Sequence, residues 1–135
     1  MYKNILVPVD LADIERGKAS LDLAKAIGGD DCKITILNVA ERIPAYIEAE
    51  LPQDLREKTI LNARTAVEDL ASAAGGCAAQ IKTGRSYNVI LSTAEEMGAD
   101  LIIIGSHRPG LQDYLLGSTA ARVVRHSKCS VLVSR

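Results

Sequence analysis

The chain reads Asp-Leu-Ile-Ile-Ile-Gly over residues 100–105, its most apolar run. A short run of aliphatic, β-branched residues between a turn former and a glycine is typical of a strand that is buried on both faces of a sheet. We therefore expect a strand over residues 100–105, at the centre of a parallel sheet.

Similar segments occur on both sides of this run. Further strands are expected over residues 3–9, 33–39, 77–83 and 129–134, and the more polar segment 77–83 is expected at an edge of the sheet. Between them, helical spacing of apolar residues predicts helices over about 14–28, 53–74, 87–97 and 118–126, with residues 40–51 as a long connection. Asp13 and Ser86 are the expected N-caps of the first and third helices. Strands that alternate with helices predict an α/β fold with a five-stranded parallel sheet and right-handed crossovers, in a single domain over residues 1–135.

Composition excludes several classes of function. The 135 residues hold 16 Lys and Arg against 17 Asp and Glu, a formal net charge of −1, with four Tyr and no Phe or Trp. This balance lacks the basic surface and the stacking aromatics that nucleic-acid binding needs. No apolar run is long enough to span a bilayer, and residues 1–9 predict a strand and no signal peptide. Cys32, Cys77 and Cys129 lack metal-ligand or redox spacing, which suits a reducing compartment, so we expect a cytoplasmic protein with no membrane or nucleic-acid partner.

An unusually long loop follows the apolar strand. Open parallel sheets bind ligands at the carboxyl ends of their strands. Residues 105–118 begin at Gly105 and end at Gly117-Ser118, which opens a helix, whereas connections in such folds usually take about 2–6 residues. Main-chain amides left open between positions 105 and 119, together with the helix macrodipole, would attract an anion. The alternative is that the glycines only form turns and that Ser118 only caps its helix.

The sequence resembles the universal stress protein family over its whole length. The resemblance rests on K-N-I-L-V-P-V-D at 3–10, G-A-D-L-I-I-I-G-S-H at 98–107 and L-L-G-S-T-A-A-R-V-V-R-H-S-K-C-S-V-L-V at 115–133. Ser-His-Arg-Pro followed by Tyr-Leu-Leu-Gly-Ser is most similar to the F-type branch. The resemblance implies a three-layer, flavodoxin-like (adenine nucleotide alpha hydrolase-like) sandwich with strand order 3-2-1-4-5. Strands one and four would then be neighbours, and Asp10 and Gly105 would share a crevice.

The resemblance also implies an adenine-nucleotide site. Many family members bind ATP through G-x2-G-x9-G-[ST], which matches Gly105 and Gly117-Ser118, while Arg108 replaces the second glycine and the loop is one residue shorter. ATP, with any Mg²⁺ arriving on its phosphates, would contact Pro8, Val9, Asp10, Val39, Gly105, Ser106, His107, Arg108, Gly110, Gly117, Ser118 and Thr119. Val9 and Val39 would wall the adenine, with backbone groups reading its edge.

Each of these residues also has a simpler interpretation. Asp10 can be a turn former, the two valines can be core residues, His107 can bond to backbone, and Arg108 can be a solvated charge or pair with another subunit. We read His126 as structural.

Three functions stay open on the sequence. The first is a stress-associated regulatory protein that binds ATP and forms a homodimer, or a tetramer, through Cys129–Ser134. The second is a slow ATP hydrolase, for which no dedicated base is evident. The third is an interaction protein that binds no nucleotide.

Overall fold

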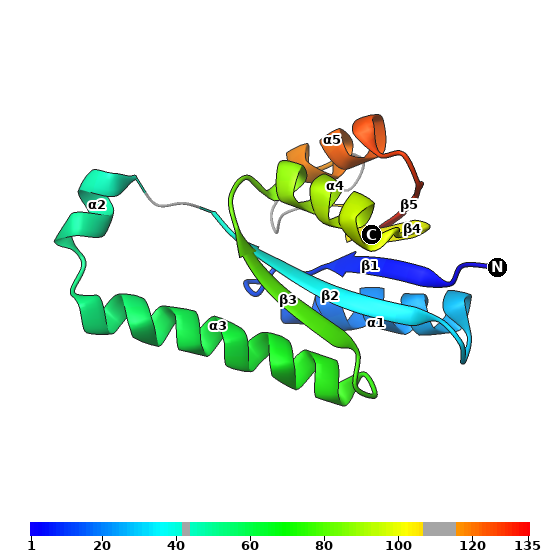
Figure 1. Ribbon diagram of the computed structural model, residues 1–135, viewed down its shortest axis with the longest axis horizontal. Helices are drawn as coiled ribbons and strands as arrows, with labels where there is room; N and C mark the ends of the chain where they lie inside the picture. Colours follow the sequence, from blue (N-terminus) through cyan, green and yellow to red (C-terminus); the bar gives the residue numbers. More distant parts are fainter. Residues whose placement is uncertain (42–43, 107–115) are drawn as a thin grey trace.

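Strands and helices alternate along the chain in the computed structural model, which describes residues 1–41, 44–106 and 116–135. The elements are β1 (Asn4–Pro8), α1 (Ile14–Gly28), β2 (Lys33–Ala40), α2 (Ala45–Glu50), α3 (Gln53–Ala73), β3 (Ala78–Thr83), α4 (Ser86–Met97), β4 (Leu101–Gly105), α5 (Ser118–His126) and β5 (Ser130–Ser134). The five strands are parallel and lie in the order β3-β2-β1-β4-β5 (Figure 1). The expected fold class and strand order are confirmed.

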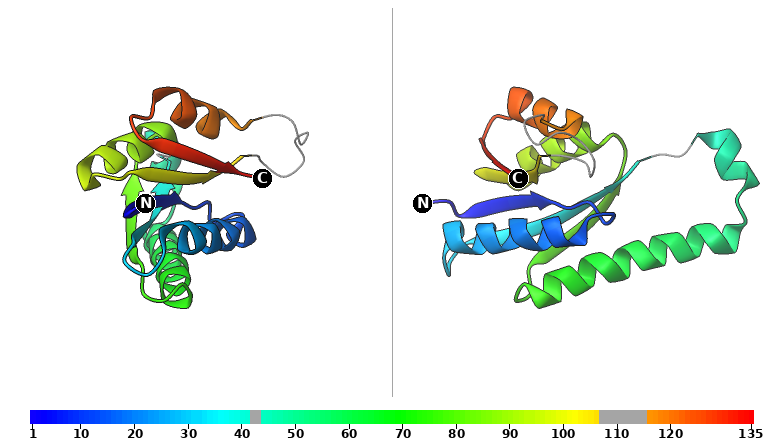
Figure 2. Two further views of the ribbon diagram at one scale, coloured as in Figure 1. Left: turned by 90° about the vertical axis from the view of Figure 1, so that its right-hand side faces the viewer. Right: turned by 180° about the vertical axis from the view of Figure 1, so that it is seen from behind.

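Side chains alternate between the two faces of the sheet, and this alternation creates two apolar layers. On β1, Ile5 and Val7 pack with α1 and α3, while Leu6 packs on the opposite face with α4 and α5. The turned views show these helix pairs on opposite sides of the sheet (Figure 2). Because both faces are covered, the inner strands are largely apolar, and Thr35 and Asn38 of β2 are buried polar residues.

The apolar strand β4 does not occupy the middle position that we expected from its composition. It lies between β1 and β5, and β1 is the central strand. Leu101, Ile102, Ile103 and Ile104 are nevertheless all buried. The strand needs only a neighbour on each edge and a helix layer on each face to be fully covered, so burial does not identify the middle of a sheet.

The segment expected as a connection over 40–51 contains the short helix α2. Pro44 precedes its first residue, a place where a proline is compatible with a helix. α2 and the first half of α3 extend beyond the sheet (Figure 1). Leu55 and Ile60 are consequently exposed, and the buried part of α3 is confined to its second half. α3 has 21 residues, yet no helix in the described ranges is long and apolar enough to cross a membrane.

One of the two expected N-caps is confirmed and the other is wrong. The Asp13 carboxylate accepts a hydrogen bond from the Arg16 amide at 3.3 Å and caps α1. Ser86 is the first residue inside α4, after Arg85 as N-cap, and its hydroxyl donates to Glu41 at 3.2 Å. A serine at a helix start satisfies backbone amides only when it stands one residue before the helix.

β3 and β5 are the two edges of the sheet. The expectation that segment 77–83 forms an edge is therefore confirmed. β5 pairs with β4 on one side and carries Val131, Leu132 and Val133 half-buried. Homodimerisation through the other side of this strand stays a prediction, as does the single-domain organisation.

Asp100 ties the beginning of β4 to the beginning of β1. Its carboxylate accepts from the Lys3 amide at 2.8 Å and from the Asn4 amide at 3.0 Å. These two N–H groups, that of Lys3 first, hold the pKa of the Asp100 carboxyl below its usual value against the opposing effect of burial. The ionised carboxylate therefore stabilises the folded chain.

We expect Asp100→Asn to lower the free energy of unfolding by about 1–2 kcal/mol at pH 7, because the amide replaces one of the two acceptors by a donor. Since the folded pKa lies below the unfolded one, the stabilisation is present above about pH 4 and is lost as the pH falls through the folded pKa. Urea unfolding at pH 7 and pH 3 checks this, with the exposed Asp22→Asn as control. A pH-independent difference between the wild type and Asp100→Asn would contradict it.

Candidate functional site

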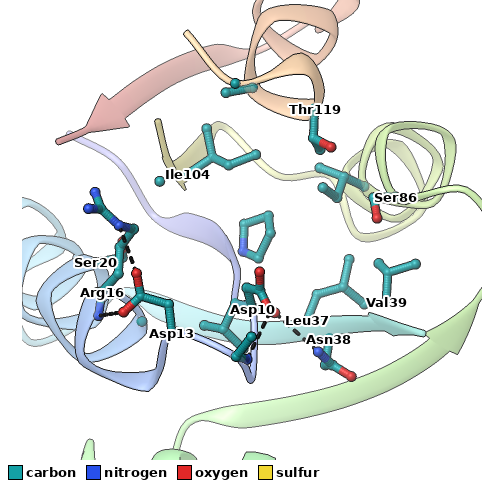
Figure 3. Close-up of a pocket in the computed structure, with 18 of the residues that line it drawn as sticks. Asp10, Asp13, Arg16, Ser20, Leu37, Asn38, Val39, Ser86, Ile104 and Thr119 are labelled. Atoms are coloured by element: carbon teal, nitrogen blue, oxygen red, sulfur yellow. Dashed lines mark hydrogen bonds and ion pairs between the residues drawn. The ribbon is translucent and has the colours of Figure 1, made fainter. Parts of the chain in front are cut away.

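A cavity of about 620 Å³ opens at the carboxyl ends of β1, β2 and β4, beside the first turns of α1, α4 and α5 (Figure 3). Small-molecule sites commonly measure about 300–1,000 Å³. Nine of the predicted binding residues line it: Pro8, Val9, Asp10, Val39, Gly105, Ser106, Gly117, Ser118 and Thr119. His107, Arg108 and Gly110 lie outside the described residues.

The chain topology explains why the cavity forms here. β1 continues into α1 on one face of the sheet, whereas the chain after β4 leads to α5 on the other face. β1 and β4 are neighbours, with Leu6 opposite Ile102. The two connections leave their strands in opposite directions, so a crevice opens between them at this switch point.

The end of β1 is held rigidly by its neighbour β2. The Val9 amide donates to the Leu37 carbonyl at 2.8 Å, and the side-chain amide of Asn38 donates to the Val9 carbonyl at 3.1 Å. Val9 itself is buried, at 7 % exposure. Its amide and one lone pair of its carbonyl are therefore already bonded within the protein, and the expectation that backbone groups of Val9 and Val39 read the edge of a base stays a prediction. Val9 lines the cavity.

Asp10 follows at the surface of the cavity. Its Oδ1 accepts from the Ala12 amide at 2.9 Å, so the turn-forming interpretation holds for this oxygen. The residue as a whole is exposed, at the middle of the cavity wall (Figure 3). The two interpretations of Asp10 are thus compatible, because one carboxylate oxygen forms the turn and the side chain still faces the hollow.

The amides around the long loop are only partly open. The Ser106 amide donates to the Ser134 carbonyl at 2.9 Å, and the Gly117 amide donates to the Ser106 carbonyl. These two amides are bonded within the protein, so they are not among the open amides that we expect between positions 105 and 119.

The start of α5 offers amides that precede the first intrahelical bond of the helix. Gly117 is the N-cap, and the Ala121 amide makes the first intrahelical bond, to the Gly117 carbonyl at 2.9 Å. The amides of Ser118, Thr119 and Ala120 precede that bond, as the first N–H groups of any helix do. Ser118 does not cap this helix, which corrects the alternative interpretation of that residue.

Arg16 supplies a charge that the sequence analysis missed. It lies one turn into α1, where its Nε pairs with Asp13 Oδ2 at 3.3 Å and its Nη1 donates to the Ser134 carbonyl at 3.5 Å. Its stem packs over Gly105, where an added Cβ would stand 2.6 Å from Arg16 Cδ. Gly105 therefore makes room for this arginine. The spacing of Asp13 and Arg16 at i and i+3 was the available signal.

Asn38 was also missed, although a polar residue inside the apolar run 33–39 could have identified it. It is 8 % exposed. The other lining residues absent from the prediction are Ala12, Asp13, Gly17, Ser20, Leu37, Glu41, Ser86, Ile90, Ile104 and Ala120. Most of these belong to helix starts or strand ends, and their convergence depends on the topology.

A second hollow of about 630 Å³ continues from the first along the start of α4. The two share Glu41, Ser86, Ser118 and Thr119. Across the described ranges, no group of three or more His, Cys, Asp or Glu residues is placed to hold a metal ion. The first cavity thus offers apolar packing at the β2 end, and helix amides, hydroxyls and the Arg16 guanidinium at the β4 and α5 end. Arg85 and Arg122 line the second hollow.

Comparison with known proteins identifies the family of this chain. The model of the universal stress protein family matches residues 1–135. The chain belongs to the universal stress protein family. Universal stress protein G of Salmonella typhimurium (strain LT2) is 31 % identical over 142 residues, with both chains covered completely. Universal stress protein MJ0531 of Methanocaldococcus jannaschii is 32 % identical over 98 % of this chain and 82 % of its own length.

Solved structures of universal stress proteins and similar proteins share the fold. The structure of hypothetical protein MJ0577 matches with a TM-score of 0.80 at 29 % identity, covering 98 % of this chain and 95 % of that one. A universal stress protein solved in complex with cAMP matches with a TM-score of 0.61 at 26 % identity, covering 99 % and 97 %. The F-type branch suggested by the loop sequence stays a prediction.

Proposed function

We propose that this universal stress protein binds an adenine nucleotide, ATP in the first place, in the cavity between β1 and β4, and that it acts as a stress-associated regulatory binding protein. The adenine would lie against Val39 and Val9 at the β2 end, and the phosphates would lie against Ser118 and Thr119 at the start of α5. Any Mg²⁺ would arrive with the phosphates.

One observation carries this proposal. Residues from three distant parts of the sequence, around positions 9, 39 and 118, line one cavity of about 620 Å³. Each offers what its part of a nucleotide needs. Val39 gives an apolar wall for a flat base, and the first amides of α5 give donors and a positive dipole end for an anion.

The solved relatives support the same ligand class. A family member with 26 % identity has been solved with cAMP, which contains an adenine base and a phosphate. The chain has a comparable fold over 99 % of its length. That this chain binds a ligand of the same class is part of the proposal.

Equilibrium dialysis of the purified protein against ATP, ADP, AMP, cAMP and GTP, with and without Mg²⁺, tests the proposal. We expect saturable binding of the adenine nucleotides at a stoichiometry of one per chain and weaker binding of GTP. Denaturing the protein as purified and separating the supernatant by chromatography detects any nucleotide already bound.

The same samples distinguish the two alternative functions. Phosphate release from bound ATP, above that of the buffer, would identify a hydrolase. Absence of binding at millimolar concentrations of every nucleotide, together with no released adenine absorbance, would contradict the proposal and leave an interaction protein.

A further inference from the structure

The wall of the cavity carries more acidic than basic side chains among its described residues. Asp10, Asp13 and Glu41 line it, and Arg16 is the only cationic side chain among its described lining residues. Carboxylates repel a phosphate group, and the helix amides alone supply only partial charges. A cation in the wall therefore decides how well an anionic ligand is tolerated.

We propose that Arg16 is the specificity-determining residue that makes this site prefer phosphorylated adenine nucleotides over neutral adenosine. This inference rests on the proposed function. It adds a residue on α1, outside the glycine-containing loop, to the groups that face the phosphates.

The position of Arg16 supports this assignment. Its stem packs over Gly105, the last residue of β4, and its Nη1 reaches the Ser134 carbonyl, the same carbonyl that accepts from the Ser106 amide. The guanidinium thus lies beside the segment that leads into the long loop. Figure 3 shows Arg16 and Val39 on opposite sides of Asp10, so the cation lies away from the apolar end where the base would pack.

The side chain is also held in place. The Asp13 carboxylate pairs with Nε at 3.3 Å, and the side chain is 23 % exposed. A guanidinium that is held by these partners keeps one orientation, and its positive charge attracts a phosphate group. Asp13 therefore positions Arg16 as well as capping α1.

Isothermal titration with ATP, AMP and adenosine tests the inference on wild type, Arg16→Gln and Arg16→Lys. We expect Arg16→Gln to weaken ATP binding by about 10- to 100-fold, the size of one charge-assisted hydrogen bond, and adenosine binding by less than about 3-fold. Arg16→Lys keeps the charge without the fork and should fall between wild type and Arg16→Gln. Lys18→Gln is the matched control, because it removes one positive charge from α1 at a residue outside the cavity lining.

The outcomes separate this inference from the proposed function. If wild type prefers ATP over adenosine and Arg16→Gln keeps that preference, the inference is overturned while nucleotide binding stands. Loss of the preference in Arg108→Gln alone would overturn it in favour of the loop arginine. Equal weakening of ATP and adenosine in Arg16→Gln, with a lowered melting temperature, would also overturn it, because it indicates a structural effect. If wild type binds none of the three ligands, the proposed function itself fails.

Discussion

Ser118→Asp should reduce the affinity for ATP by at least about 100-fold while leaving the melting temperature unchanged or slightly higher. Ser118 is the first residue of α5 and lines the cavity. A carboxylate at this position would stand where the phosphates of the ligand are expected. The same carboxylate is favourable for the helix, because the positive end of the macrodipole lies at the N-terminus.

Ser118→Asn is the matched control, since it has nearly the same shape as aspartate without its charge. We expect it to retain ATP binding within about 10-fold, because it removes one hydroxyl contact at most. Adenosine should bind both variants about equally well, because it carries no phosphate. Undiminished ATP binding to Ser118→Asp would show that the phosphates lie elsewhere.

Ile103→Ala is expected to lower the free energy of unfolding by about 3–4 kcal/mol, the largest stability effect that we predict for a single substitution. Ile103 is fully buried on β4, where it packs in the apolar layer between the sheet and α1. Alanine would leave a cavity that the parallel strands on both sides prevent from closing. In a chain of this size, the loss corresponds to a fall of about 10 °C in melting temperature.

Ile60→Ala is the control for that prediction. Ile60 is 61 % exposed on the half of α3 that extends beyond the sheet. Its truncation should change the free energy of unfolding by less than about 0.5 kcal/mol. Equal losses in the two variants, measured by urea unfolding, would mean that the exposed half of α3 is packed against something in solution.

Much of the fold was predictable because the strands, apart from the more polar β3, are short apolar runs bounded by turn formers. The observed strands differ from the expected ranges by a residue or so at their ends, as β4 (Leu101–Gly105) does from 100–105. The strand order came from the family resemblance. Alternation of strands and helices alone predicts a parallel sheet, and many orders satisfy it.

Features that depend on contacts between distant parts of the chain were harder to predict. The apolar spacing of α3 indicates which face would be buried, but it does not say that the sheet ends before Leu55 and Ile60. α2 was missed because Pro44 suggested irregular structure, although a proline is tolerated immediately before a helix.

The candidate site likewise contains residues that the sequence alone could identify and residues that it could not. Positions at strand ends, such as Asp10 and Gly105, could be named from the sequence because parallel strands place their carboxyl ends on one side. Arg16 and Asn38 could not, since each depends on a specific contact: Arg16 reaches across to the end of β5, and Asn38 holds the end of β1. The openness of individual amides, as for Ser106, likewise depends on which carbonyl lies nearest.

Titration of ¹⁵N-labelled protein with ATP and Mg²⁺, followed by amide chemical shifts, tests most directly whether the cavity between β1 and β4 is the nucleotide site. We predict the largest shifts at Asp10, Val39, Ser118 and Thr119, with the amides of α2 unmoved. Shifts that gather on α2 and the exposed half of α3, or no shifts at millimolar ATP, would contradict the account.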